Sequence, residues 1–118
     1  MTLTGNPNIF AKWTIYPNQI QRIVRITKEV VSIASKNKGI ITIQYRNGIR
    51  REALYREQVI EWDESKSAIR AELYLSVILG NGNTDTLILD VSEILHIENR
   101  TEIEIIRKFQ DAFSQTHN

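Results

Sequence analysis

Apolar side chains recur with a helical period between residues 17 and 38. Placed on a helix, this stretch gathers one apolar arc about half the circumference wide, opposite an arc of polar and charged residues. The apolar arc consists of Ile20, Ile23, Val24, Thr27, Val30, Val31 and Ala34. Pro17 suits the first turn of such a helix and Gly39 its exit. The pattern therefore predicts a helix over 17–38, although its many β-branched residues lower the intrinsic helix propensity.

The alternating segment 40–56 is interrupted by Asn47-Gly48, a strong signal for a β-hairpin. A two-residue turn would mix apolar and charged side chains on each face of this hairpin. A three-residue loop with a bulge at Gly48 instead pairs Ile41 with Ala53 and gathers the apolar side chains on one face. Because burial fixes the register of a strand pair, we predict the bulged hairpin.

Alternation of apolar and polar residues continues as far as a last short strand expected at 94–97. In between, we expect a short strand around Trp62, a polar loop and a second hairpin. An apolar stripe over 101–115 then predicts a closing helix. Thr101 and Glu104 have the spacing of a capping box at the start of this helix.

These elements describe one domain of 118 residues with no repeat and no linker. Its composition, 42% hydrophobic and 25% charged, is that of a globular protein. The predicted fold class is α+β: a small curved antiparallel sheet or barrel of about five strands, with an N-terminal and a C-terminal helix. The predicted parts are an arm of ambiguous structure at 1–16, the helix 17–38, strands within 40–97 and the helix 101–115.

The chain contains no cysteine, which excludes disulfides and thiolate metal sites. Its apolar runs, such as 73–79, are too short for a membrane-spanning helix. The first residues lack the basic and apolar regions of a secretory signal. We therefore expect a cytoplasmic protein with no membrane association.

Charge is divided unevenly along the chain. Residues 1–56 carry ten basic and two acidic side chains, a net charge of +8, whereas residues 57–118 carry five basic and twelve acidic ones, a net charge of −7. Such asymmetry is typical of proteins that bind a charged partner. It is equally consistent with two halves that attract each other in the folded molecule, and the sequence leaves both interpretations open.

The best candidates for a binding site are arginines of the basic half. Guanidinium groups suit phosphates and carboxylates, and phosphate contacts supply most of the sequence-independent affinity for nucleic acid. A solvated or internally paired face is the alternative interpretation. The predicted ligand-binding residues are Arg22, Arg25, Arg46, Arg50 and Arg56.

Catalytic patterns are weak in this sequence. His96 lies in an expected strand and His117 near the C-terminus, and without cysteine they do not form a transition-metal site of the common kinds. Nucleophilic catalysis would need His96 as its base, and no nucleophile-elbow motif is present. We predict no catalytic residue, no metal and no cofactor. The remaining enzymatic alternative is a small hydrolase or isomerase built on the acidic loop that contains Asp63 and Glu64.

Three expected strand segments follow the first helix, at 41–46, 73–77 and 87–94, and their order is similar to that of a known family. On these segments the stretch 30–97 resembles the WYL domain. The resemblance implies a small Sm-like barrel that senses nucleic acid or nucleotide ligands in bacterial regulators. Strands closed by a C-terminal helix are equally similar to bacterial pleckstrin-homology-like domains, whose partners bind at the barrel rim.

Two functions follow as hypotheses. The first is a non-enzymatic regulatory binding module, which binds nucleic acid or a phosphate-bearing ligand on its basic face. The second is a protein-interaction or assembly adaptor with a pleckstrin-homology-like fold. As a homodimer, this adaptor would set the basic half of one subunit on the acidic half of the other.

Overall fold

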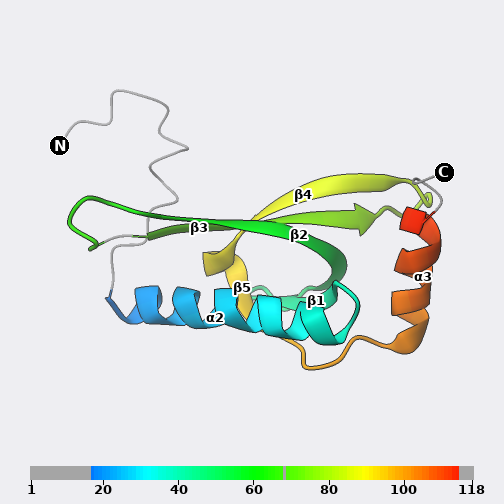
Figure 1. Ribbon diagram of the computed structural model, residues 1–118, viewed down its shortest axis with the longest axis horizontal. Coiled ribbons are helices and arrows are strands. Elements are labelled where there is room, and N and C mark those ends of the chain that lie inside the picture. Colours follow the sequence, from blue (N-terminus) through cyan, green and yellow to red (C-terminus); the bar gives the residue numbers. More distant parts are fainter. Residues whose placement is uncertain (1–16, 68, 115–118) are drawn as a thin grey trace.

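The computed structural model describes residues 17–67 and 69–114. Two helices flank five strands in this part of the chain, as predicted (Figure 1). The elements are α2 (Pro17–Lys36), β1 (Ile40–Tyr45), β2 (Arg50–Trp62), β3 (Ile69–Ile78), β4 (Thr84–Asp90), the 3₁₀ helix η1 (Val91–Glu93), β5 (Ile94–Ile97) and α3 (Ile103–Ser114). The arm predicted at residues 1–16 lies outside the described residues.

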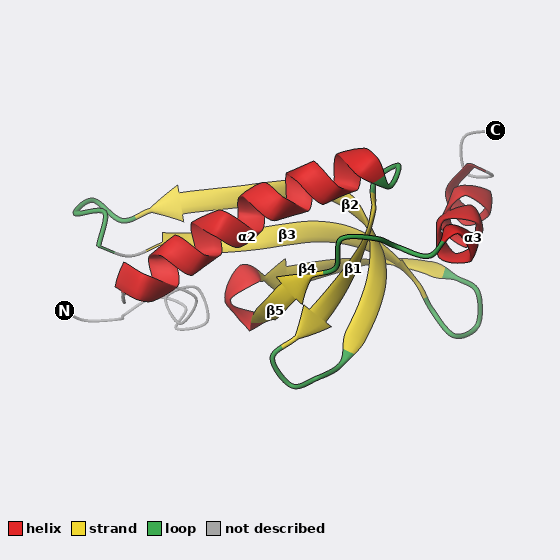
Figure 2. Ribbon diagram, turned by 90° about the horizontal axis from the view of Figure 1, so that it is seen from below, coloured by secondary structure: helices red, strands yellow, loops and turns green. Residues whose placement is uncertain are grey.

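The five strands form one antiparallel sheet in the order β4-β3-β2-β1-β5. Strands β4 and β5 are its two edges and do not pair with each other, so the sheet is curved but open. Helix α2 lies along one face of this sheet, and α3 stands at one end of it (Figures 1 and 2). The α+β class and the curved sheet between two helices are confirmed, and the closed barrel is not formed.

The first hairpin has the predicted bulged register. Ile41 lies opposite Ala53, and the amide of Tyr45 donates to the carbonyl of Ile49 at 2.8 Å. Gly48 takes the left-handed φ of +89° that the bulge requires. Burial of one face therefore selected the register, as expected.

Strand β2 differs from the prediction. The short strand expected around Trp62 is the far end of one continuous 13-residue strand. Its pairing with β3 shifts register between Tyr55 and Glu57, so Arg56 is an extra residue on β2. Such a bulge bends a strand without ending it. Strand β2 thus pairs first with β1 and then with β3, and it carries Trp62 to the end of the sheet away from α3 (Figure 1).

The core lies between α2 and the sheet face that it covers. Helix α2 contributes Ile23, Ile26 and Val30, all at most 1% exposed. The strands supply the facing side chains, which are Ile41, Ile43, Ala53, Ile69, Ala71, Leu73, Leu75, Val77, Leu89, Ile94 and Ile97. The buried stripe of α2 includes Ile26 and leaves out Val31, which the sequence placed on the apolar arc and which is 44% exposed. Arg25, Lys28 and Lys36 of the helix are exposed.

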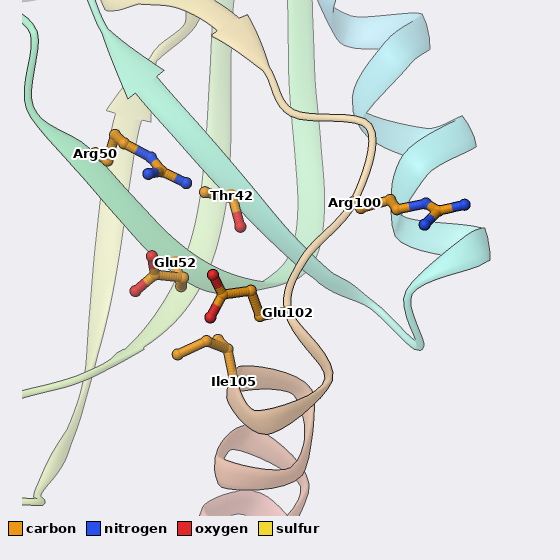
Figure 3. Close-up of a pocket in the computed structure, with 6 residues that line it drawn as sticks. All are labelled: Thr42, Arg50, Glu52, Arg100, Glu102 and Ile105. Atoms are coloured by element: carbon orange, nitrogen blue, oxygen red, sulfur yellow. The ribbon is translucent and has the colours of Figure 1, made fainter.

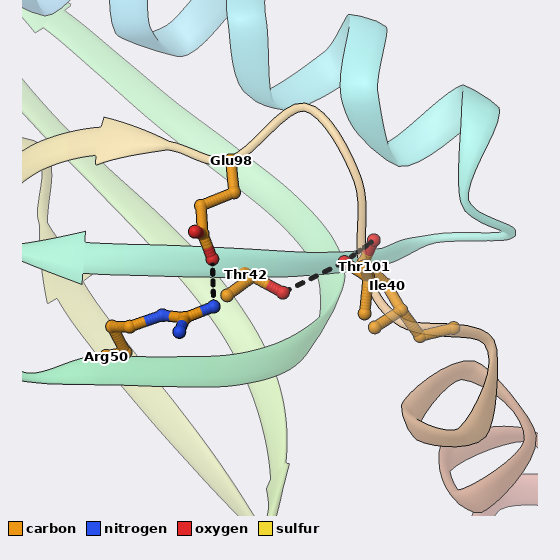
Figure 4. A network of polar contacts seen from close by, with 5 residues as sticks. All are labelled: Ile40, Thr42, Arg50, Glu98 and Thr101. Atoms are coloured by element: carbon orange, nitrogen blue, oxygen red, sulfur yellow. Dashed lines mark hydrogen bonds and ion pairs between the residues drawn. The ribbon is translucent and has the colours of Figure 1, made fainter.

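Thr101 fastens the chain before α3 to strand β1. Its hydroxyl lies 3.0 Å from that of Thr42 and donates to the carbonyl of Ile40 at 3.5 Å (Figure 4). Both threonines are buried. The predicted capping box of Thr101 with Glu104 is therefore not used, because α3 begins at Ile103 and the hydroxyl of Thr101 serves β1 instead.

Thr101→Val is expected to lower the free energy of unfolding by about 1.5 kcal/mol, because it leaves a buried hydroxyl on Thr42 without its partner. Urea unfolding followed by circular dichroism measures this loss. The double variant Thr42→Val/Thr101→Val removes both hydroxyls at constant shape and should recover most of the stability. A double variant that loses more than the sum of the single variants would contradict the shared hydrogen bond.

Candidate functional site

The side chain of Arg22 and the backbone of Arg46 both contact the chain where η1 passes into β5. Arg22 lies on α2, and its Nη2 donates to the carbonyl of Leu95 at 3.5 Å. Arg46 follows β1, and its amide donates to the carbonyl of Glu93 at 3.0 Å. Arg25 is one turn along α2 from Arg22, where residues three apart are neighbours on the helix surface. We call Arg22, Arg25 and Arg46 the arginine triad.

The positive charges of Arg46 and Arg25 act electrostatically on Arg22. Partial burial lowers the pKa of Arg22 below its ordinary value, and the positive charges of Arg46 and then Arg25 lower it further. Like charges held together in this way create a positive potential that favours an anion. A phosphate or carboxylate placed among them would relieve the repulsion.

No carboxylate of the described residues neutralises the triad. Ion pairs in this part of the chain join Arg50 to Glu98, and Arg70 to Glu61 and Glu72. In residues 17–67 and 69–114, the Arg50–Glu98 pair is thus the ion pair that connects the basic half with the acidic half. None of the described ion pairs involves a member of the triad.

The structure places Arg50 away from the triad. Its guanidinium is held by Glu98 beside Thr42 (Figure 4). It lines a polar pocket of about 160 Å³ with Thr42, Glu52, Arg100, Glu102 and Ile105 (Figure 3). In Figure 3, Glu52 and Glu102 lie close together beside Ile105, and Arg100 points away from them. The acidic pair makes this pocket a poor site for a phosphate.

Arg56 holds α3 against the sheet. Its Nε donates to the hydroxyl of Ser76 at 2.8 Å, and its guanidinium lies 5.3 Å from the ring centroid of Phe113. The ring of Phe113 stacks in turn on that of Phe109, which is buried. The contacts of Arg56 are therefore with β3 and α3, and it is not part of the triad.

A groove beside the triad contains residues that the sequence did not single out for binding. It has a volume of about 600 Å³ between α2 and the end of β2. Its lining residues are Ile20, Gln21, Val24, Arg25, Lys28 and Trp62. The spacing of Lys28 from Arg25 was visible in the sequence, but the approach of Trp62 to α2 depends on the continuous strand β2.

Two features are absent from the described part of the chain. It contains no group of three or more histidine, cysteine, aspartate or glutamate residues that could hold a metal ion. Of the two helices that the structure describes, neither has the length and apolar character needed to cross a membrane.

Comparisons with known proteins add no assignment to this geometry. No model of a protein family matches the chain, and neither a curated protein nor a solved structure gives a significant match. The function is therefore argued from the site itself.

Proposed function

We propose that the protein is a non-enzymatic regulatory binding module that takes the phosphates of a nucleic acid on the arginine triad. The observation that carries the proposal is the convergence of Arg22, Arg25 and Arg46 with no carboxylate of the described residues paired to them. The sequence-based resemblance to WYL domains agrees with such a ligand and stays a prediction.

The chemistry of the triad suits phosphate oxygens. A guanidinium offers planar, paired donors that match a phosphate, and its hydrogen bonds to an anion are about twice as strong as neutral ones. Arg22 is already partly desolvated, so an anion there is screened less by water. The first turn of α2 contains no acidic residue that would oppose an anion.

The test is binding of a fluorescein-labelled 12-nucleotide single strand, measured by fluorescence anisotropy between 20 and 300 mM salt. Arg22→Ala and Arg46→Ala are each expected to weaken binding about tenfold at low salt, because each removes a charge-assisted phosphate contact. Each should also reduce the slope of log affinity against log salt by about 0.7, the value for one phosphate contact on a single strand.

Arg107→Ala on α3 is the matched control, since it removes an exposed arginine from the other helix. It should leave both affinity and salt slope close to those of the wild type. A flat titration of the wild type at 20 mM salt would sink the proposal. So would an effect of Arg107→Ala as large as that of Arg22→Ala.

A second candidate function, self-assembly, is favoured by strand β4. All seven residues of β4 pair with β3 without a register shift, and no described strand pairs with its other edge. This edge contains no lysine, arginine or proline to oppose pairing, and Ile88 is 52% exposed. Two copies aligned antiparallel about Leu87 would place Asp85 opposite Leu89, so no two acids face each other.

Sedimentation velocity tests this candidate. The wild type is expected to form a dimer at tens of micromolar, and Ile88→Lys should convert it to a monomer. The variant Leu79→Lys, with a lysine at an exposed apolar position outside β4 (40% against 52% for Ile88), should leave the dimer intact. A wild type that stays monomeric at every concentration would remove this candidate.

A further inference from the structure

We infer that the groove beside Trp62 is a stacking site for a nucleobase of single-stranded nucleic acid, whose backbone crosses α2 to the arginine triad. The inference rests on the proposed function and deepens it, because it names the kind of nucleic acid and the residue that distinguishes it. It is carried by the exposed indole, the groove lining and the row of cations between the two sites.

Trp62 presents an aromatic surface at the end of β2. Its side chain is 43% exposed and lines the groove opposite residues of α2, among them Ile20 and Val24. Its strand position is fixed by pairing with Ile69 of β3, which is fully buried. A base that enters the groove can therefore stack on a held indole against an apolar wall, as bases do on single-strand-binding surfaces.

The polar residues of the groove match the rest of a nucleotide. Gln21 carries an amide that both donates and accepts, which suits the edge of an unpaired base. Arg25 and Lys28 supply positive charge at the same groove, where a backbone phosphate would lie. An aliphatic chain would use the apolar wall alone, so this combination favours a nucleotide.

Two acids, Glu61 and Asp63, flank Trp62 in the sequence. Glu61 precedes Trp62 in β2, and adjacent residues of a strand point to opposite faces. Glu61 pairs with Arg70 on that other face at 2.6 Å. Glu61 is thus directed away from the groove and neutralised. Asp63, the other acid next to Trp62 in sequence, accepts hydrogen bonds from Ser65 and Ser67 in the loop between β2 and β3.

A continuous row of cations leads from the groove to the triad. Arg22, Arg25 and Lys28 are spaced by three residues, and such rows run obliquely across the surface of a helix. In Figure 2 the end of β2 emerges on one flank of α2, β3 passes behind the helix, and strands β1 and β5 lie on the other flank. Lys28 and Arg25 line the groove on the first flank, and Arg22 reaches Leu95 on the second. A backbone that follows this row meets a cation at each step.

The experiment compares two probes on the full chain: the 12-nucleotide single strand and inorganic polyphosphate, which has charge but no base. Trp62→Ala is expected to weaken binding of the oligonucleotide about tenfold and to leave polyphosphate binding within twofold. Trp62→Phe keeps an aromatic ring and should restore most of the oligonucleotide affinity. Leu79→Ala is the matched control, because Leu79 is exposed to a similar degree, 40% against 43%.

A second measurement does not depend on the folding of Trp62→Ala. Trp62 and Trp13 are the two tryptophans of the sequence, so Trp13→Phe leaves Trp62 as the single indole fluorophore. Stacking should quench its emission when the oligonucleotide binds, and polyphosphate should not quench it. Quenching by both probes to the same extent would contradict the stacking site.

The outcomes separate this inference from the proposed function. If both probes bind but Trp62→Ala changes neither affinity, the stacking site is wrong and the arginine triad stands. If Trp62→Ala weakens both probes equally, Trp62 acts only on the fold, and the inference is again overturned. If neither probe binds the wild type at low salt, the proposed function and the stacking site both fail.

Discussion

Leu73→Ala is expected to lower the free energy of unfolding by about 3 kcal/mol, because it removes a buried branched side chain and leaves a cavity. Leu73 is fully buried in β3, between Gln58 of β2 and Leu89 of β4. Helix α2 packs on the same core, so we expect it to stay in place over the sheet and not to fill the cavity. Urea unfolding measured by circular dichroism gives the change directly.

Ile88→Ala on the neighbouring strand β4 is the control for this prediction. Ile88 is 52% exposed, so the same kind of truncation should lower the free energy of unfolding by less than about 1 kcal/mol. Since domains are stable by about 5–15 kcal/mol, the loss at Leu73 is a large part of the total. Equal losses at the two positions would contradict the placement of the core.

Much of the fold could be predicted because one face of each element is buried. The first hairpin shows this most clearly: only the bulged register places Ile41 opposite Ala53 and gathers the apolar side chains on the covered face, with Arg51 opposite Ile43 as the exception. The period of α2 is equally informative, since Ile23, Ile26 and Val30 are almost fully buried. Local pattern and tertiary burial agree at these positions.

The sequence misplaced two features, the extent of β2 and the role of Thr101, because each depends on pairing with a distant segment of the chain. The bulge at Arg56 inserts one residue into β2, so the alternation changes phase although the strand continues. A change of phase in the sequence is indistinguishable from a loop. The hydroxyl of Thr101 is likewise used by Thr42, 59 residues away, and no local spacing reveals that partner.

The candidate site could be predicted by residue type but not by grouping. The sequence selected five arginines, and the structure brings Arg22, Arg25 and Arg46 together because β5 pairs with β1 beside α2. Arg50 and Arg56 are directed elsewhere by Glu98 and Phe113. Both partners come from distant parts of the chain, so the division of the basic face is a property of the topology.

The charge asymmetry of the two halves takes a more specific form in the structure. Of the basic residues at 17–56, Arg50 is the one that the structure joins in an ion pair to a carboxylate of the described second half. Among the described residues, ion pairing between the two halves is thus limited to this contact. None of the described ion pairs involves the row from Arg46 through α2 to Lys28.

Arg70→Met is expected to lower the free energy of unfolding by about 2–3 kcal/mol, because it removes the cation paired with the buried carboxylate of Glu72. The carboxylate of Glu72 lies 3.0 Å from Nη2 of Arg70, and its side chain is only 5% exposed. The hydrogen bond to Glu72 also raises the pKa of Arg70. The loss should be smaller than for a fully buried pair, since a quarter of the Arg70 side chain reaches water.

Glu61→Gln is the matched control, because it breaks the other ion pair of Arg70 at a carboxylate that is 48% exposed. Its cost should stay below about 1 kcal/mol, as for surface pairs in general. Arg70 ties β2 to β3 beside the pair Trp62 and Ile69, so Arg70→Met should also weaken oligonucleotide binding through the less firmly held indole. Polyphosphate binding should change little, because it needs no stacked indole and Arg22 contacts Leu95 on the other flank of α2. A stability loss in Arg70→Met no larger than in Glu61→Gln would show that the charge of Glu72 does not depend on Arg70.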